Sequence, residues 1–244
     1  MASRSKKKAK NSDSGSEKLV NLRVIEAHKT LQKLHTAFPY VVIAVAVLVL
    51  VCLCLPVTGI NATIDLSDGG GEGVYKASSS VNVVSILFAP ISVGEGGWIN
   101  FLAQGLLSGG NSDAINQSIV DYIDAGFTTS QKAMLDQVMD LQHVVAFVFA
   151  VMWIAIVVVG AIGSAKKKSA SLLVVLCSVF SILSLAELVT LMVVSLQGVA
   201  GSSFVTGVGA YALPIVLMGA TAVLIKWQTS YAKATKTIRE EEKQ

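Results

Sequence analysis

The stretch that decides the fold is "FPYVVIAVAVLVLVCLCLPV", residues 38–57, which contains no charged side chain. About 20 residues of α-helix, at 1.5 Å of rise each, cross the roughly 30 Å hydrocarbon core of a membrane. Every backbone N–H and C=O group in hydrocarbon needs a partner within the protein, so such a run must be helical. Its many valines favour strands in water, but the lipid environment outweighs that preference. We therefore predict a transmembrane helix here.

Three further apolar runs follow, at residues 144–163, 171–196 and 204–225. Of the 244 residues, 53% are hydrophobic and only 14% are charged, whereas soluble domains carry about 25% charged residues. Residues 1–37 are too long a leader for a cleaved signal peptide, so the first run is interpreted as an anchor that stays in the chain. The predicted fold class is an all-α integral membrane protein with a bundle of four transmembrane helices.

The distribution of charge predicts the orientation of these spans. Residues 1–37 contain nine Lys and Arg, and the tail 226–244 is also charged. The long loop 58–143 contains two Lys against nine Asp and Glu. The positive-inside rule therefore places both termini and the Lys-rich turn 164–170 in the cytoplasm of a cell-membrane protein. The long loop and the short turn 197–203 are then extracellular.

The segment before the first span divides into two parts. Residues 1–17 are basic, rich in Ser and without aromatic residues, which predicts a disordered tail. Residues 18–37 combine apolar residues at roughly helical spacing with Lys and Arg, which predicts an amphipathic helix on the cytoplasmic membrane surface. The alternative for 18–37 is a simple extension of the first span. Basic side chains on this side are expected to contact anionic lipid head groups rather than nucleic acid; they are Arg23, Lys29, Lys33, Lys166, Lys167 and Lys168.

The long outer loop, residues 58–143, is large enough to fold as a cap rather than serve as a connector. Residues 111–126 and 129–141 have helical spacing, and the second of these helices is expected to continue into the second span. The apolar stretch 81–93 predicts one or two short strands, with a re-entrant segment as the alternative. Trp98 is expected to anchor the loop at the outer membrane interface. We predict a mixed, mostly helical cap that offers a surface for partners.

Small residues in the spans mark expected helix contacts, because helices in lipid associate through close packing. The positions are Gly160, Gly163, Gly207 and Gly219, together with Pro214 in the fourth span. Ordinary packing within one bundle accounts for all of them, so they do not by themselves indicate a function.

The third span carries a polar residue at every third position; the relevant members are Ser181, Ser184, Glu187 and Thr190. Such a stripe normally faces the bundle interior or another chain, not lipid. Glu187 follows Lys168 by 19 residues, a helical rise of about 28 Å, so it belongs in the outer half of the membrane. His143, at the start of the second span, is a candidate neighbour. Three roles stay open for Glu187: a packed carboxyl, a contact with a partner helix, and a proton or cation site.

The sequence offers little chemistry for catalysis. It contains no Walker loop, dinucleotide fingerprint, nucleophile elbow or zinc-protease motif. The predicted topology separates His28 and His35 from His143 by the membrane, so they cannot form one metal site. The three cysteines lie in apolar runs, where cysteine behaves as a small hydrophobe. We expect a non-enzymatic protein without a cofactor or a metal.

The predicted arrangement, with cytoplasmic termini, four spans and a large first outer loop, is similar to that of claudins. The resemblance is one of topology, because the claudin loop signature of a Trp, then Gly-Leu-Trp, then two cysteines is missing and Trp98 stands alone. Connexins also have four spans, but their outer-loop cysteines are absent here, and tetraspanins place the large loop second. We expect an accessory, scaffold or assembly subunit of a larger hetero- or homo-oligomeric membrane complex. The alternative is an oligomeric channel or transporter subunit that uses the stripe around Glu187.

Overall fold

The computed structural model describes residues 3–65, 74–88, 129–166, 170–196 and 202–241. The described chain is mostly helical, and four of its helices are long and apolar enough to cross a membrane, which confirms that part of the prediction. These four helices are α1 (Ser3–Cys54), α5 (Thr129–Lys166), α6 (Ser171–Ser195) and α7 (Val208–Glu241).

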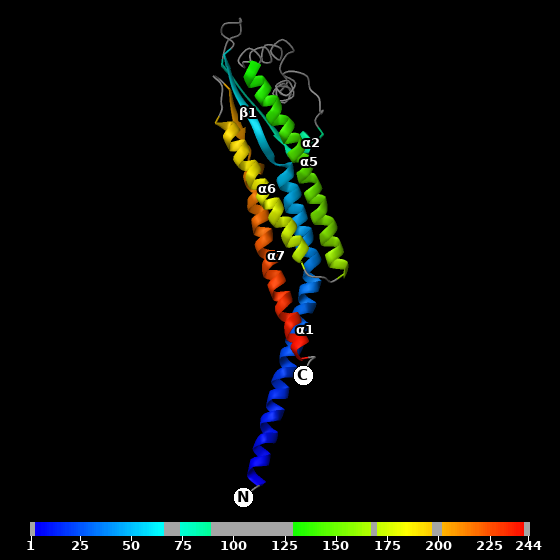
Figure 1. Ribbon diagram of the computed structural model, residues 1–244. Coiled ribbons are helices and arrows are strands. Elements are labelled where there is room, and N and C mark those ends of the chain that lie inside the picture. The colour runs from blue at the N-terminus through cyan, green and yellow to red at the C-terminus, as the bar shows by residue number, and fades with distance from the viewer. Residues whose placement is uncertain (1–2, 66–73, 89–128, 167–169, 197–201, 242–244) are drawn as a thin grey trace.

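The four long helices pack in a ring (Figure 1): α1 contacts α7 and α5, and α6 contacts α7 and α5. The interior of the ring is filled by large side chains that are almost fully buried, such as Phe180 of α6, Ile156 of α5 and Leu217 of α7. Phe149 meets Phe180 edge to face, with ring centroids 5.1 Å apart, a favoured geometry for aromatic pairs. In lipid this dense packing, more than the hydrophobic effect, holds the helices together.

One end of the bundle carries a small sheet, and we call it the sheet end. Strands β1 (Pro56–Asp65), β2 (Val74–Asn82) and β3 (Ser202–Thr206) are antiparallel in the order β2-β1-β3. Residues Thr58–Ala62 of β1 pair with β3, so the segment between α6 and α7 joins the segment that follows α1. Residues 202–203 of the predicted turn and the first residues of the predicted fourth span, 204–206, are therefore corrected to a strand.

The sheet end also corrects the reading of stretch 81–93. Residues 81–82 finish β2, and α2 (Val83–Leu87) follows as a short helix. The Asn82 side chain caps α2 by accepting a hydrogen bond of 2.7 Å from the Ser85 backbone N–H. The strands lie instead at β1 and β2, where Thr, Ile, Val and Ser dominate. The predicted helix 111–126 and Trp98 lie outside the described residues.

The opposite end is formed by α1 and α7 alone, and we call it the terminal end because both helices end there (Figure 1). Helix α1 is unbroken from Ser3 to Cys54. The structure thus has residues 3–17 in a helix in place of the predicted disordered tail. It also has residues 18–37 as an extension of the first span, the alternative to a helix lying on the membrane. The predicted tail from residue 226 likewise continues α7 to Glu241.

A heptad pattern explains why these extensions pair. On α1 the residues turned inward follow spacings of four and three: Ala27, Leu31, Leu34 and Phe38. On α7 the matching residues are Trp227, Tyr231, Ala234 and Ile238. Alternating spacings of this kind are typical of coiled-coil seams. Phe38 packs on Trp227 with ring centroids 5.4 Å apart, and His35 packs on Tyr231 at 5.7 Å.

Candidate functional site

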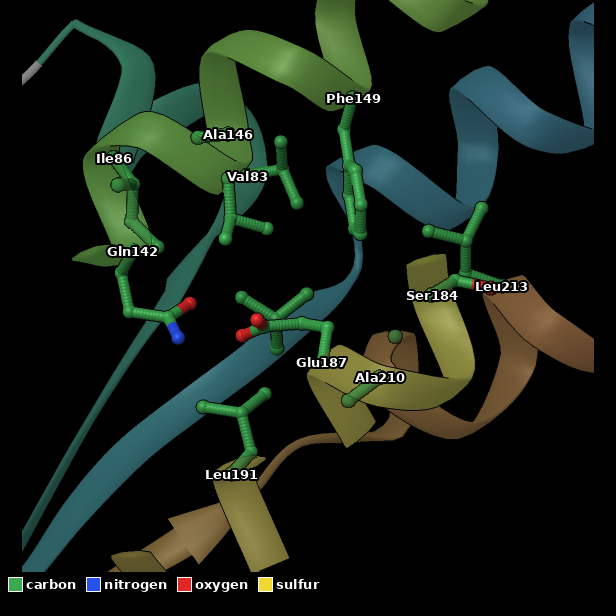
Figure 2. Close-up of a pocket in the computed structure, with 13 residues that line it drawn as sticks. Val83, Ile86, Gln142, Ala146, Phe149, Ser184, Glu187, Leu191, Ala210 and Leu213 are labelled. Atoms are coloured by element: carbon green, nitrogen blue, oxygen red, sulfur yellow. The ribbon is translucent and has the colours of Figure 1, made fainter. Parts of the chain in front are cut away.

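The candidate site is a cavity at the sheet end, enclosed by four helices and one strand (Figure 2). Most of its wall is apolar, and the polar side chains come from only two helices, α5 and α6. The lining residues are Val57 of β1, Val83 and Ile86 of α2, Gln142, Val145, Ala146 and Phe149 of α5, Ser184, Glu187 and Leu191 of α6, and Gly209, Ala210 and Leu213 of α7.

Helix α6 turns part of its predicted polar stripe into this cavity. Ser184, Glu187 and Leu191 are separated by three and four residues, so they share one helix face. Ser181 and Ser184 are buried, and the Ser184 hydroxyl donates a hydrogen bond of 2.9 Å to the Ser181 carbonyl. Thr190 lies on a more exposed side and donates to the Ala186 carbonyl at 3.1 Å. The hydroxyl groups of Ser184 and Thr190 thus bond their own helix, and Glu187 is the member of the stripe that reaches toward α5.

The polar residue that faces Glu187 is Gln142 of α5 (Figure 2). Gln142 is only 3% exposed. Its side chain lies within hydrogen-bonding reach of the Glu187 carboxyl, and Gln142 Nε2 and Glu187 Oε1 are both buried. His143, the neighbour expected from the sequence, does not line the cavity. The signal for Gln142 is its position one turn before Ala146 and two turns before Phe149, on the inward face of α5.

The predicted packing glycines fall into two groups. A Cβ on Gly160 would collide with Val42, and one on Gly163 would lie 3.2 Å from Phe38, so both allow α5 to approach α1 closely. A Cβ on Gly207 would collide with the Pro56 carbonyl. Gly219 differs, because no described atom lies within 4 Å of the position its Cβ would take. Among the described residues, no helix therefore packs closely on Gly219.

Two further contacts involve the centre of the bundle. Pro214 is buried within α7, in agreement with its predicted place in the packing. Trp153 of α5 donates its indole N–H to the Ala46 carbonyl of α1 at 2.9 Å. This interhelical bond was not predicted, although a Trp within a span needs an acceptor for its N–H and so carries the signal.

Three of the predicted lipid-contacting residues lie at the terminal end. Arg23, Lys29 and Lys33 are exposed on α1, and Arg23 borders an open groove between α1 and α7. Lys166 is the last residue of α5, while Lys167 and Lys168 fall outside the described residues. Across the described ranges, no group of three or more His, Cys, Asp and Glu side chains is placed to hold a metal ion.

Comparison with protein-family models, with curated proteins and with solved structures found no match to this chain.

Proposed function

We propose that this chain is a non-enzymatic accessory, scaffold or assembly subunit of a larger membrane complex, which binds its partners through the spans and the extracellular cap. The observation that carries the proposal is the open surface around Gly219 on α7. The four apolar helices support a multi-pass membrane protein, and in lipid a glycine on a helix surface permits close approach of another helix.

The surroundings of Gly219 fit a helix from another chain. Gly160 and Gly163 are covered by side chains of α1, whereas Gly219 is left uncovered by the described residues. Ile215 and Met218, one turn and one residue before it, are exposed, and Ala222 extends the small-residue surface one turn further. A partner helix that crosses here gains backbone-to-backbone contact without displacing a bulky side chain.

The packing of the bundle favours this proposal over a channel subunit. A pore shared between chains would require the polar stripe of α6 to face outward. Ser181 and Ser184 are buried in their own bundle, and Glu187 faces Gln142 of the same chain. Large side chains such as Phe180 and Leu217 fill the interior. Binding, rather than conduction, agrees with this arrangement.

Both ends of the chain add to the proposed docking. At the sheet end, β1 pairs with β3, and this small sheet is proposed to form part of the surface that a partner contacts. At the terminal end, Arg23, Lys29 and Lys33 project from α1 and are proposed to meet anionic head groups of the cytoplasmic leaflet. This orientation follows from the positive-inside rule.

The test is Gly219→Leu, expressed in the native membrane and compared with wild type by co-purification in mild detergent. The expected result is loss of the co-purifying membrane subunit with an unchanged melting temperature of the chain itself. Ala161→Leu is the matched control, because Ala161 is an exposed small residue on α5; it should keep the subunit. Equal retention of the co-purifying subunit by both variants would contradict the proposed docking surface.

A further inference from the structure

We propose that the open groove between α1 and α7 at the terminal end docks one α-helix of a cytoplasmic protein, and that this helix is acidic toward the membrane and basic away from it. The groove lies outside the spans and at the opposite end of the chain from the sheet. The inference therefore goes beyond the proposed partner binding and does not depend on Gly219. The cytoplasmic side follows from the positive-inside rule.

The groove runs along one side of the α1–α7 seam, and both helices line it with the same residue spacing. The lining residues are Arg23, Glu26, Ala27 and Thr30 of α1 and Ser230, Lys233, Ala234 and Thr237 of α7. Residues three and four apart form one continuous face of a helix. The groove thus has two long helical walls, which is the surface on which a third helix packs in a bundle.

The floor of the groove allows close approach by a helix. Ala27 and Ala234 lie in the seam with only 8% and 6% of their surface exposed, and such small side chains let a neighbouring helix come near. The Thr30 and Thr237 hydroxyls each donate to the carbonyl one turn earlier on their own helix, at 2.8 Å and 3.1 Å. Because these donors are already satisfied, covering them with a partner costs little.

Charged residues along the walls of the groove lie at two levels. Phe38 of α1 packs on Trp227 of α7, and the two helices run in opposite directions (Figure 1). Lys33 lies five residues beyond this pair and Lys233 lies six residues beyond it, so the two lysines are nearly level. They form a lysine level toward the membrane.

A glutamate level follows on the same helix faces. Glu26 and Glu240 each lie seven residues beyond the lysine of their own helix, and residues seven apart share one face of a coiled-coil helix. The walls of the groove are therefore basic toward the membrane and acidic away from it. All four of these side chains are exposed.

This order of charge disfavours a second copy of the chain as the occupant. Two copies in one membrane are related by a two-fold axis along the membrane normal. That axis would set α1 of each copy against α7 of the other at equal height. The lysine level would meet lysine and the glutamate level would meet glutamate, and like charges in contact weaken an interface.

A helix of a different protein can carry the complementary order. Acidic residues at its end toward the membrane lie beside the lysine level, and basic residues at its other end lie beside the glutamate level. Complementary charge of this kind fixes the register of a partner and excludes wrong ones. The docked helix is therefore divided in charge along its length.

The length of α1 gives a second, independent reason to expect a helical occupant. Helix α7 ends at Glu241, whereas α1 continues outward to Ser3 (Figure 1). A single helix of this length is marginal in water unless it packs on a neighbour. A partner helix that lies in the groove and reaches past Glu241 supplies that neighbour.

Peptide binding to the full-length chain in nanodiscs of uncharged lipid tests the charge order. The divided peptide is a fluorescent synthetic helix of about three heptads with Glu in one half, Lys in the other, and a stripe of Ala and Leu. The mixed peptide has the same composition with Glu and Lys interspersed. Fluorescence anisotropy should show that the divided peptide binds roughly tenfold more tightly or better. Equal affinity for the two peptides, or binding of neither, would overturn the proposal.

Two matched Trp variants test where the divided peptide binds. Thr30→Trp fills the groove and should weaken binding roughly tenfold. Gln32→Trp adds the same ring at an exposed position of α1 outside the groove and should bind as wild type. Equal binding by Thr30→Trp and wild type would contradict a docking site in the groove. Neither variant alters Gly219, so such a failure would leave the proposed surface on α7 untouched.

Cross-linking in the native membrane separates a foreign helix from a second copy. Thr30→Cys places a thiol in the groove, and wild type controls for the chain's own cysteines. Treatment with a bis-maleimide should give no cross-linked dimer of this chain beyond that seen in wild type. A dimer linked through residue 30 would show that a second copy fills the groove and would overturn the proposal.

Discussion

The two ends of the α1–α7 pair are built on different principles. At the sheet end the two segments meet backbone to backbone: the Gly207 N–H donates to the Val57 carbonyl at 2.9 Å, and a Cβ on Gly209 would lie 2.7 Å from the Leu55 carbonyl. At the terminal end they meet side chain to side chain, through Phe38 on Trp227 and His35 on Tyr231. Backbone groups in contact cannot move aside for an added side chain, whereas side chains in contact can adopt new rotamers. The sheet end should therefore be the less tolerant of change.

The largest effect is expected where the backbones touch. Gly207→Val places a branched side chain against the Pro56 carbonyl and the Val57 amide, and neither backbone group can rotate away. We expect a loss of roughly 3 kcal/mol or more in the free energy of unfolding, measured by thermal melting in detergent. Gly219→Val is the matched control, because its Cβ meets no described atom; a similar loss in both variants would mean that packing at Gly207 is not the cause.

A smaller effect is expected at the terminal end. Ala234 is buried in the seam of α7, but an open groove runs beside it along α1. Ala234→Leu should cost about 1 kcal/mol, the low end for overpacking, because the helix pair can separate slightly into the groove. Cysteine cross-linking between residues 31 and 234 would show whether the pair stays in register. A loss as large as that of Gly207→Val would contradict the contrast between the two ends.

Between the two ends, substitution of Trp153 tests how much one interhelical hydrogen bond contributes to stability. Trp153→Phe keeps an aromatic ring against α1 but removes the N–H that donates to the Ala46 carbonyl. Interhelical bonds in membranes average about 0.6 kcal/mol, so the melting temperature should fall only slightly. Unfolding of the variant in a denaturing detergent titration gives the loss in the free energy of unfolding. A loss above about 2 kcal/mol would point to lost packing rather than a lost hydrogen bond.

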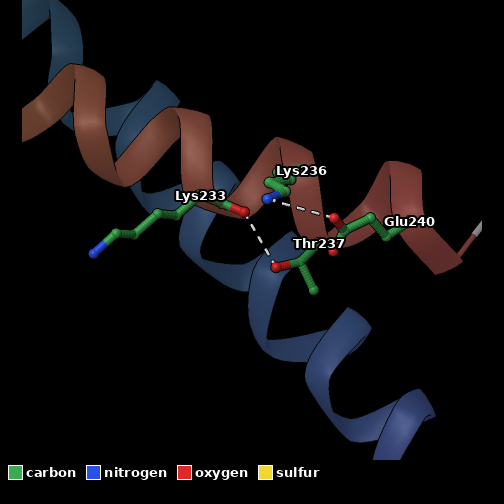
Figure 3. Close-up of polar contacts among 4 residues, drawn as sticks. All are labelled: Lys233, Lys236, Thr237 and Glu240. Carbon is green, nitrogen blue, oxygen red and sulfur yellow. Dashed lines mark hydrogen bonds and ion pairs between the residues drawn. The ribbon is translucent and has the colours of Figure 1, made fainter.

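The smallest effect is expected on the solvent face of the terminal end (Figure 3). Lys236 and Glu240 form an i,i+4 ion pair at 3.6 Å, and Thr237 donates to the Lys233 carbonyl at 3.1 Å. Both side chains of the ion pair are well exposed, and exposed pairs of this kind contribute about 0.3–0.5 kcal/mol. Lys236→Ala should therefore melt within error of wild type at physiological salt. A clear fall in the melting temperature would indicate that Lys236 makes a further contact besides the ion pair with Glu240.

The same contrast explains what the sequence could predict. The spans were predictable because length and apolarity decide them locally. The pairing of β1 with β3 was not, because Thr58–Ala62 and Ser202–Thr206 are far apart in the chain and their register depends on how the helices between them pack. Residues 18–37 were predicted to lie on the membrane surface because apolar residues alternate there with Lys and Arg. Their pairing with α7 was not predictable, because α7 extends to Glu241, well beyond its predicted span.

The candidate site was likewise predictable only in part. The inward direction of Ser184 and Glu187 followed from their spacing. Gln142 was not predicted, because only the register of α5 against α6 decides whether Gln142 or the adjacent His143 faces Glu187. A glycine at position 219 predicts that another helix can approach α7 closely there. Whether that side of α7 faces the bundle or is left open depends on how all four long helices pack.

Native mass spectrometry of the wild-type complex, released from its own membrane in mild detergent, tests the proposed accessory role most directly. The chain alone has a mass of 25.6 kDa. We predict a complex in which this chain is joined by a different membrane protein in fixed ratio, and that Gly219→Leu reduces it to the chain alone. A wild-type mass that is a whole multiple of 25.6 kDa, unaffected by Gly219→Leu, would contradict the accessory role and favour a homo-oligomeric channel.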